Sequence, residues 1–264
     1  MNRPVPIVFE SKGAKIHGLF YKDPRVEKLP AVILCHGFPG NNKDVLGLGE
    51  RLMKEGFGAL AFNYRGTWGS EGLFTVSNSL EDVMSAIRYV KSSFAVREFN
   101  LDPSTVTIIG SSFGGGMAVL GALNDHTVRR VVYIAGGNLS EVEKMMRQSE
   151  EYKQAILNGT NEDISKSGFN SLPAEDLFAE IRADMDKYDL VKHAEALSHK
   201  DVLIIGGWRD EANTIEHHIL PLYRALQRHG AKHLQIEIFD TDHSFSNARN
   251  QLADRTVSWL RAEM

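Results

Sequence analysis

Short apolar runs alternate with longer amphipathic segments along most of this chain. Eight of the runs have the length and the β-branched or aromatic content of strands, and several are apolar on both faces, as buried parallel strands are. They are Val5–Glu10, Ala14–Phe20, Ala31–Cys35, Ala59–Asn63, Val106–Ile109, Arg130–Ala135, Val202–Ile205 and Leu234–Phe239. Because only the turn Ser11-Lys12-Gly13 separates the first two, we expect the sheet to begin with an antiparallel hairpin.

Apolar residues recur at three- and four-residue spacing between these runs, which predicts amphipathic helices. The helices expected to cover the sheet are Asn42–Glu55, Ser79–Phe94, a segment that ends near Leu123, Thr214–His229 and Asn247–Arg261. Strands and helices in alternation predict an α/β protein whose mostly parallel sheet is flanked by helices.

The alternation is interrupted over residues 137–199, where no core strand is evident. Leu139–Leu157 and Ala174–Tyr188 predict charged amphipathic helices that are joined by a polar stretch. We therefore expect a core of residues 1–136 and 200–264 with a helical insertion between its two parts. We interpret the insertion as a cap over the carboxyl ends of the strands; surface helices that belong to the core are the alternative.

The composition is that of an ordinary folded protein, with 42% hydrophobic and 24% charged residues among 264. The formal net charge is −4, and the absence of lysine or arginine runs argues against nucleic-acid and membrane partners. The amino-terminal residues lack the apolar stretch of a signal peptide. The single cysteine, Cys35, has apolar neighbours, which predicts a buried thiol and favours a reducing cytoplasm.

A glycine-rich turn follows the run Val106–Ile109. Gly110, Ser112 and Gly114 fit the G-x-S-x-G nucleophile elbow, in which a serine occupies a sharp turn between a strand and a helix. Gly114 is followed by two more glycines, and each costs about 1 kcal/mol relative to alanine inside a helix, so we expect tight packing there. The alternative is a glycine-rich turn between strand and helix that has no catalytic role. The patterns of phosphate and dinucleotide loops are absent.

A serine nucleophile needs a base to accept its proton and a group that orients the base. Asp210 and His243 lie just beyond the last two predicted strands, so the order along the chain is serine, acid, histidine. Asp210 has alternatives: it could simply cap a helix, and the neighbouring acids Glu211, Asp240 and Asp242 are other candidates. The remaining histidines, including the exposed-looking pair at positions 217 and 218, are interpreted as structural or solvated.

The elbow and the order serine, acid, histidine occur together with the turn His36-Gly37-Phe38-Pro39-Gly40. With these features the chain resembles the α/β-hydrolase superfamily over nearly its whole length. The elbow residues and the loop Tyr64-Arg65-Gly66 are similar to those of carboxylesterases and cinnamoyl esterases related to prolyl oligopeptidase-type hydrolases. The resemblance implies an α/β-hydrolase fold, with a mostly parallel eight-stranded sheet and a helical cap.

The resemblance also implies roles for individual residues. Ser112 is the expected nucleophile, His243 the general base and then acid, and Asp210 the carboxylate that orients it. The oxyanion hole is expected to use the backbone N–H groups of Phe113 and Phe38, since Pro39 has no N–H to donate.

Several large side chains could line a substrate pocket. Trp68 and Trp208 lie beside the predicted catalytic loops, as do the two phenylalanines of the oxyanion hole, and Met145 and Met146 lie in the predicted insertion. Packing into the core is the alternative for each of them. Acyl and alcohol specificity cannot be derived from these residues.

We therefore expect a serine esterase that cleaves small-molecule carboxylic esters through an acyl-enzyme, with a homodimer as a possible assembly. No metal-ligand spacing such as H-E-x-x-H is present, so we expect neither metal nor organic cofactor. A serine peptidase or aminoacyl hydrolase of the prolyl oligopeptidase type is one alternative, although such peptidases usually carry a large additional amino-terminal domain. A non-catalytic binding protein is the other, and it would be expected to lose a member of the triad.

Overall fold

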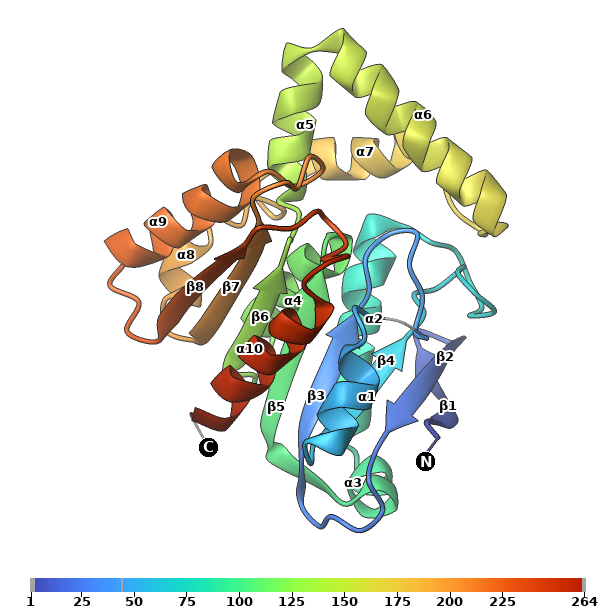
Figure 1. Ribbon diagram of the computed structural model, residues 1–264. Helices are drawn as coiled ribbons and strands as arrows, with labels where there is room; N and C mark the ends of the chain where they lie inside the picture. The colour runs from blue at the N-terminus through green and yellow to red at the C-terminus, as the bar shows by residue number, and fades with distance from the viewer. Residues whose placement is uncertain (1–2, 44, 263–264) are drawn as a thin grey trace.

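The computed structural model describes residues 3–43 and 45–262, and its strands form one eight-stranded sheet (Figure 1). The strand order is β1-β2-β4-β3-β5-β6-β7-β8, which confirms the predicted α/β architecture. The strands are β1 (Val5–Ser11), β2 (Ala14–Tyr21), β3 (Leu29–Cys35), β4 (Gly58–Phe62), β5 (Leu101–Ser111), β6 (Arg130–Ile134), β7 (Asp201–Gly207) and β8 (Leu234–Phe239).

The sheet is mostly parallel. β2 runs antiparallel to both β1 and β4, and the remaining neighbours pair in parallel. The predicted hairpin is confirmed: Ser11 pairs with Ala14, and Lys12 and Gly13 turn the chain with φ values of 50° and 84°. Because β3 to β8 are parallel, their carboxyl ends meet at one edge of the sheet, where loops can converge on a ligand.

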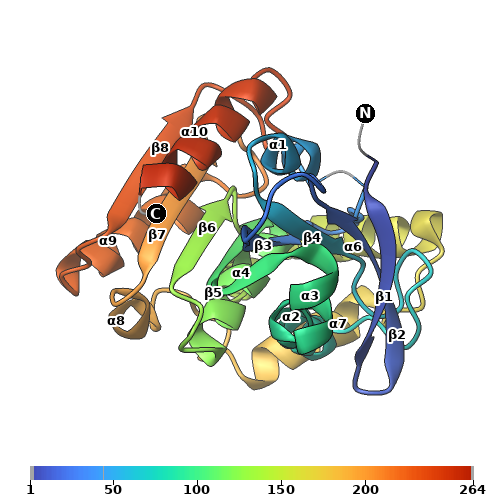
Figure 2. The same cartoon turned by 90° about the horizontal axis from the view of Figure 1, so that it is seen from below.

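Helices cover both faces of the sheet, and Figure 2 shows α1 and α10 on one face and α2 and α3 on the other. Side chains of α1 and α10 pack with β3, β6 and β7 in one apolar core, and the helices of the second face enclose the other. Cys35 lies fully buried in the second core, as predicted. The helices are α1 (Leu48–Lys54), α2 (Val76–Lys91), α3 (Ser93–Phe99), α4 (Phe113–Asn124), α5 (Leu139–Gln148), α6 (Glu150–Ser167), α7 (Ala174–Ala183), α8 (Ala194–Leu197), α9 (Leu220–Arg228), α10 (Arg249–Ala262) and a π-helical turn, Ile215–Ile219.

Several predicted boundaries were wrong for local reasons. The first helix begins at Leu48 rather than Asn42, because Gly47 precedes it in a left-handed conformation with φ 73°; residue 44 lies outside the described residues. The predicted helix Leu139–Leu157 is two helices, since the backbone of Ser149 is extended and its hydroxyl accepts a hydrogen bond from the N–H of Tyr152, 3.1 Å away. An apolar pattern that runs through such a cap does not reveal the break.

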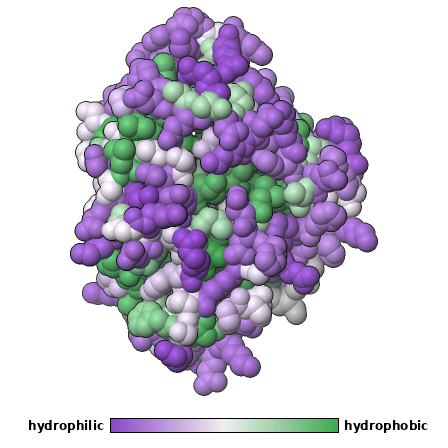
Figure 3. All heavy atoms as spheres, turned by 180° about the vertical axis from the view of Figure 1, so that it is seen from behind, coloured by the Kyte–Doolittle hydropathy of each residue, from purple (hydrophilic) through white to green (hydrophobic). Residues whose placement is uncertain are grey.

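Between β6 and β7 the chain forms α5 to α8. Figure 1 shows α5, α6 and α7 above the carboxyl ends of the strands, while α8 lies near α9 beside the sheet. From behind, mostly polar side chains cover this upper region, and apolar side chains gather below it near the middle of the face (Figure 3). We call α5, α6 and α7 the three-helix segment.

No helix within residues 3–43 and 45–262 is both long and apolar enough to cross a membrane.

Candidate active site

Ser112 occupies the sharp turn between β5 and α4, and the predicted order of strand, turn and helix is confirmed. Its backbone has φ 56° and ψ −124°, a conformation that costs a non-glycine residue about 1–3 kcal/mol. The turn is held by hydrogen bonds: the Ser112 N–H donates to the Ile134 carbonyl at 3.0 Å, and its own carbonyl accepts from Gly115 at 2.9 Å and Gly137 at 3.0 Å. These bonds to the end of β6 keep the serine in the strained turn.

The glycines around Ser112 are required by close backbone contacts. A Cβ atom on Gly110 would lie 2.0 Å from the carbonyl oxygen of Gly114, and one on Gly114 would lie 2.2 Å from the carbonyl oxygen of Cys35. A Cβ atom on Gly116 would lie 2.6 Å from the carbonyl oxygen of Gly137. The expected tight packing of the glycine run is therefore confirmed, and its physical cause is the passage of α4 against the ends of β3 and β6.

Asp210 and His243 meet at the carboxyl ends of β7 and β8. His243 Nδ1 lies 2.8 Å from Asp210 Oδ2. The Asp210 side chain is fully buried, and its Oδ1 accepts hydrogen bonds from the backbone N–H groups of Ala212 at 2.9 Å and Asn213 at 2.8 Å. Asp210 therefore orders its own loop and contacts the histidine with its second oxygen.

The other acids considered from the sequence have different partners. Asp240 pairs with Arg209 at 2.9 Å, and Asp242 accepts a hydrogen bond from the N–H of Ser246 at 2.9 Å. Glu211 is exposed to solvent. Among these candidates the structure brings only Asp210 into contact with His243, in the part of the chain that it describes.

The contact between His243 and Asp210 leaves the Nε2 atom of the histidine for another partner. Among the hydrogen bonds of the described residues, none joins His243 to the Ser112 hydroxyl. The two side chains lie at the same edge of the sheet, Ser112 after β5 and His243 after β8.

The turn after β3 passes directly over Ser112. A Cβ atom on Gly37 would lie 3.0 Å from Ser112 Cβ and 3.6 Å from its Oγ. Neither Phe38 in this turn nor Phe113 at the start of α4 donates its backbone N–H to another described residue. Both N–H groups proposed for the oxyanion hole are thus available to a ligand.

Two of the histidines interpreted as structural or solvated lie buried near the site. His36 precedes the turn, with Nδ1 2.6 Å from the Gly37 carbonyl oxygen, and burial lowers its pKa to about 4. His218 is buried rather than exposed, and the structural role expected for it fits its contact: its Nδ1 accepts a hydrogen bond from the N–H of Asn138 at 3.2 Å, and burial lowers its pKa to about 4. Both rings are therefore neutral supports for neighbouring loops near pH 7.

An apolar cavity of about 190 Å³ opens beside Ser112. Its walls come from the turn after β3, the start of α2, the elbow and the three-helix segment. The lining residues are Phe38, Phe74, Val76, Ser112, Phe113, Gly137, Leu139, Val142, Ile156, Thr160, Leu177, Phe178, Ile181 and Asn213. A serine hydroxyl at the wall of an apolar cavity is suited to the attack on a bound carbonyl group.

Of the side chains predicted for the pocket, Phe38 and Phe113 line this cavity, whereas four others do not. Trp208 is 61% exposed, and Trp68 is 44% exposed and donates its indole N–H to the Gly40 carbonyl at 2.8 Å. Met146 is buried and lines a separate cavity, and Met145 lines neither. Residues such as Phe178 were missed because their place depends on how the three-helix segment packs on the core.

No cluster of three or more His, Cys, Asp or Glu side chains that could hold a metal ion occurs in the described part of the chain.

The sheet order, the elbow serine and the converging loops define the class of protein: the chain has the α/β-hydrolase fold. Residues 50–264 match the model of the prolyl oligopeptidase family. The chain belongs to this family, as its resemblance suggested.

Solved esterases share the fold. An esterase from Pyrococcus furiosus superposes with a TM-score of 0.74 at 18% identity, covering 98% of this chain and 91% of that one. Est1E from Butyrivibrio proteoclasticus, solved with bound ferulic acid, gives 0.72 at 16% identity over 96% and 97% of the two chains. A Pyrobaculum calidifontis esterase gives 0.72 at 16% identity over 100% and 86%.

Curated relatives match over shorter stretches. The quorum-quenching protein AidA of Acinetobacter baumannii is 32% identical over 134 residues, which are 49% of this chain and 42% of AidA. An uncharacterised 31.7 kDa protein of Escherichia coli is 31% identical over 109 residues, or 40% of this chain and 36% of that protein. The matches thus span less than half the length of these relatives.

Proposed function

We propose that this protein hydrolyses small carboxylic esters through an acyl-enzyme, with Ser112, His243 and Asp210 as a catalytic triad. The observation that carries the proposal is the 2.8 Å contact between His243 Nδ1 and the buried Asp210, at the same sheet edge as an elbow serine beside an apolar cavity. The three side chains have the order and the strand-end positions that the α/β-hydrolase mechanism requires.

The first step begins with proton transfer. An ionised carboxylate can only accept hydrogen bonds, so Asp210 holds the proton of His243 on Nδ1 and leaves the lone pair on Nε2. Nε2 takes the Ser112 proton as Oγ attacks the ester carbon. When the tetrahedral intermediate collapses, the imidazolium returns this proton to the departing alcohol, and the acyl group remains on Ser112.

The second step uses water. His243 removes a proton from a water molecule, whose oxygen attacks the acyl carbon, and the proton then returns to Ser112 Oγ as the carboxylic acid leaves. In both steps the backbone N–H groups of Phe38 and Phe113 stabilise the oxyanion. Removal of one such donor in a comparable enzyme costs about 100- to 1,000-fold in kcat.

Esters are favoured over peptides by the cavity and by the similar structures. The wall beside Ser112 is formed mainly by aliphatic and aromatic side chains, six of them from the three-helix segment, which suits a small acyl or aryl group. The similar structures named above are esterases. The family name supports the second candidate, a peptidase or aminoacyl hydrolase.

A substrate panel tests the proposal. Purified protein and its Ser112→Ala variant are assayed on p-nitrophenyl esters of increasing acyl length, feruloyl esters, a lactone and aminoacyl anilides. We expect serine-dependent turnover of short or aryl esters and much slower cleavage of the anilides. The opposite ranking would assign a peptidase, and no serine-dependent turnover of any substrate would favour a binding protein.

A further inference from the structure

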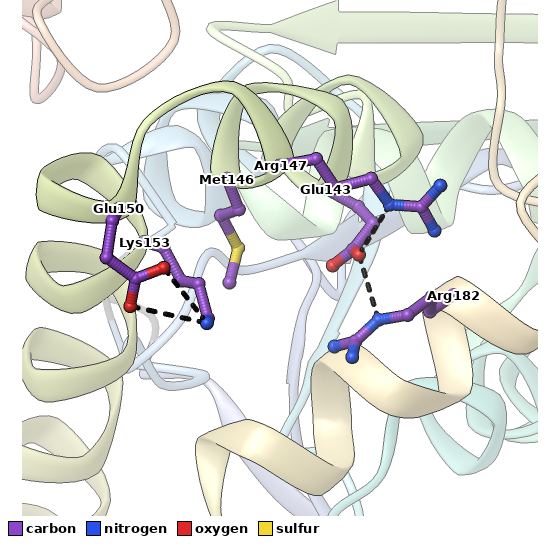
Figure 4. Close-up of a pocket in the computed structure, with 6 residues that line it drawn as sticks. All are labelled: Glu143, Met146, Arg147, Glu150, Lys153 and Arg182. Atoms are coloured by element: carbon purple, nitrogen blue, oxygen red, sulfur yellow. Dashed lines mark hydrogen bonds and ion pairs between the residues drawn. The ribbon is translucent and has the colours of Figure 1, made fainter.

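A second cavity, of about 290 Å³, lies within the three-helix segment and has charged walls (Figure 4). Its volume is close to the lower end of the range of small-ligand pockets, about 300–1,000 Å³. Glu143, Met146 and Arg147 of α5, Glu150 and Lys153 of α6 and Arg182 of α7 line it. None of them lines the cavity beside Ser112, so the two cavities have separate walls on the same helices.

Glu143 is the central group of this cavity. It is only 2% exposed, and its Oε1 accepts hydrogen bonds from Arg147 Nε at 3.1 Å and Arg182 Nε at 2.9 Å. Its other oxygen, Oε2, is buried and has no hydrogen-bond partner among the described residues. Figure 4 shows that Oε2 points to the side of the cavity where Met146 and Lys153 lie. A buried carboxylate oxygen is stabilised when it receives an N–H or O–H donor.

The basic side chains around Glu143 retain donors for an anion. Arg182 uses only Nε to bind Glu143, and its terminal nitrogens point toward the same side of the cavity as Lys153. Lys153 Nζ lies 3.2 Å from Glu150 Oε2 and 3.4 Å from Glu150 Oε1, contacts that use at most two of its three donors. With three basic and two acidic side chains, the walls have a net charge of +1, which favours an anionic group.

We propose that this charged cavity binds a small carboxylate with an N–H or O–H donor on the adjacent carbon, as in α-amino and α-hydroxy acids. The ligand carboxylate accepts hydrogen bonds from the terminal nitrogens of Arg182 and from Lys153. The neighbouring donor binds Glu143 Oε2. One ligand thus satisfies both the buried acceptor and the unused cationic donors, which neither a simple anion nor a simple cation does.

Three probes with one carbon frame test this assignment by titration calorimetry: L-alanine, L-lactate and propionate, at matched ionic strength. We expect saturable binding of L-alanine, L-lactate or both, and binding of propionate weaker by about tenfold, because propionate lacks the donor for Glu143. Equal responses to all three probes, or none, would overturn the proposal. A response to L-alanine alone or to L-lactate alone identifies the donor as an amine or a hydroxyl.

Variants separate a ligand site from surface charge. Arg182→Gln should weaken binding by about tenfold or more, since it removes donors to a charged group. Lys153→Gln should also weaken binding, although it leaves the contacts of the buried carboxylate intact. The matched control Arg97→Gln changes an exposed arginine on α3 and should have no effect. Unchanged affinity in the Arg182 and Lys153 variants would exclude the site.

Binding should persist in Ser112→Ala. That measurement separates the charged cavity from ester hydrolysis, because an inactive esterase would still bind L-alanine or L-lactate. Loss of binding in Ser112→Ala would place the ligand in the other cavity and overturn the assignment.

Discussion

The backbone N–H of Val76, the first residue of α2, donates a hydrogen bond to Glu180 Oε2 of α7 at 2.8 Å. Its other oxygen accepts a hydrogen bond from the Ser77 hydroxyl at 3.1 Å. The carboxylate therefore binds an N–H group that has no partner within its own helix, and it faces the positive end of the helix dipole. Because Val76 also lines the cavity beside Ser112, this contact ties the three-helix segment to the wall of the candidate active site.

Glu180→Ala should destabilise the protein by about 1–2 kcal/mol, the usual effect of losing a cap, and should lower turnover by loosening the cavity wall. Urea unfolding and ester kinetics measure both effects. Glu175→Gln, an exposed change on the same helix, is the control and should be near neutral. Equal losses of stability and turnover in the two variants would show that the contact between Glu180 and Val76 does not hold the cavity wall.

Ser112→Ala and His243→Ala should each lower kcat by about a millionfold, and the double variant should be little worse, because the two side chains act as a unit. Single-turnover assays with a p-nitrophenyl ester, together with labelling by a fluorophosphonate, measure this. Losses that multiply in the double variant would contradict a shared mechanism.

Asp210→Asn should lower kcat by about ten-thousandfold, since an amide no longer holds His243 in the required tautomer. Glu211→Gln is the matched control from the adjacent position and should change kcat little, because Glu211 is exposed. The reverse ranking would assign the acid to Glu211.

The stability of the fold should fall in mild acid because of His36 and His218. Burial lowers the pKa of each ring to about 4, whereas an unfolded histidine has a pKa near 6.5. The unfolded state therefore binds more protons between these values, and stability is lost as the pH falls from about 6.5 to about 4, by roughly 3 kcal/mol for each ring.

Urea unfolding at pH 7 and pH 5 measures this loss in the wild type and in His218→Gln. The variant should be less stable at pH 7 but should lose less stability on acidification. His229→Gln alters an exposed histidine and should leave the slope unchanged. An unaltered slope in His218→Gln would exclude His218 as a source of the acid sensitivity.

Ile156 and Leu157 are neighbours on α6 with different surroundings: Ile156 lines the cavity beside Ser112, and Leu157 is buried outside its lining. Ile156→Ala should enlarge the cavity and shift the preference toward longer or aryl acyl groups, with little change in Tm. Leu157→Ala should instead cost about 2–5 kcal/mol of stability and leave the ranking of esters unchanged. Unchanged rankings in both variants would rule out a role of α6 in selecting substrates.

The sequence by itself determined the features that depend on near neighbours. Apolar runs such as Val202–Ile205 predict buried strands because side chains of a strand point alternately to both covered faces. The elbow could be recognised because the strained turn at Ser112 and the close approach of Gly114 to the end of β3 demand particular residues at particular positions. The candidate serine, acid and histidine follow from these local signals.

Tertiary structure alone decided the features that depend on contacts between distant segments. Asp210, rather than Glu211, contacts His243 because of the way the loops after β7 and β8 meet, 33 residues apart in the chain. His218 is buried because Asn138 and the end of β6 pack over it, and Phe178 reaches the cavity because the three-helix segment lies over the sheet edge. Composition and periodicity indicate which face of an element is apolar but not which distant element covers it. The packing of distant elements on one another determines the walls of the cavity beside Ser112 and the charged site around Glu143.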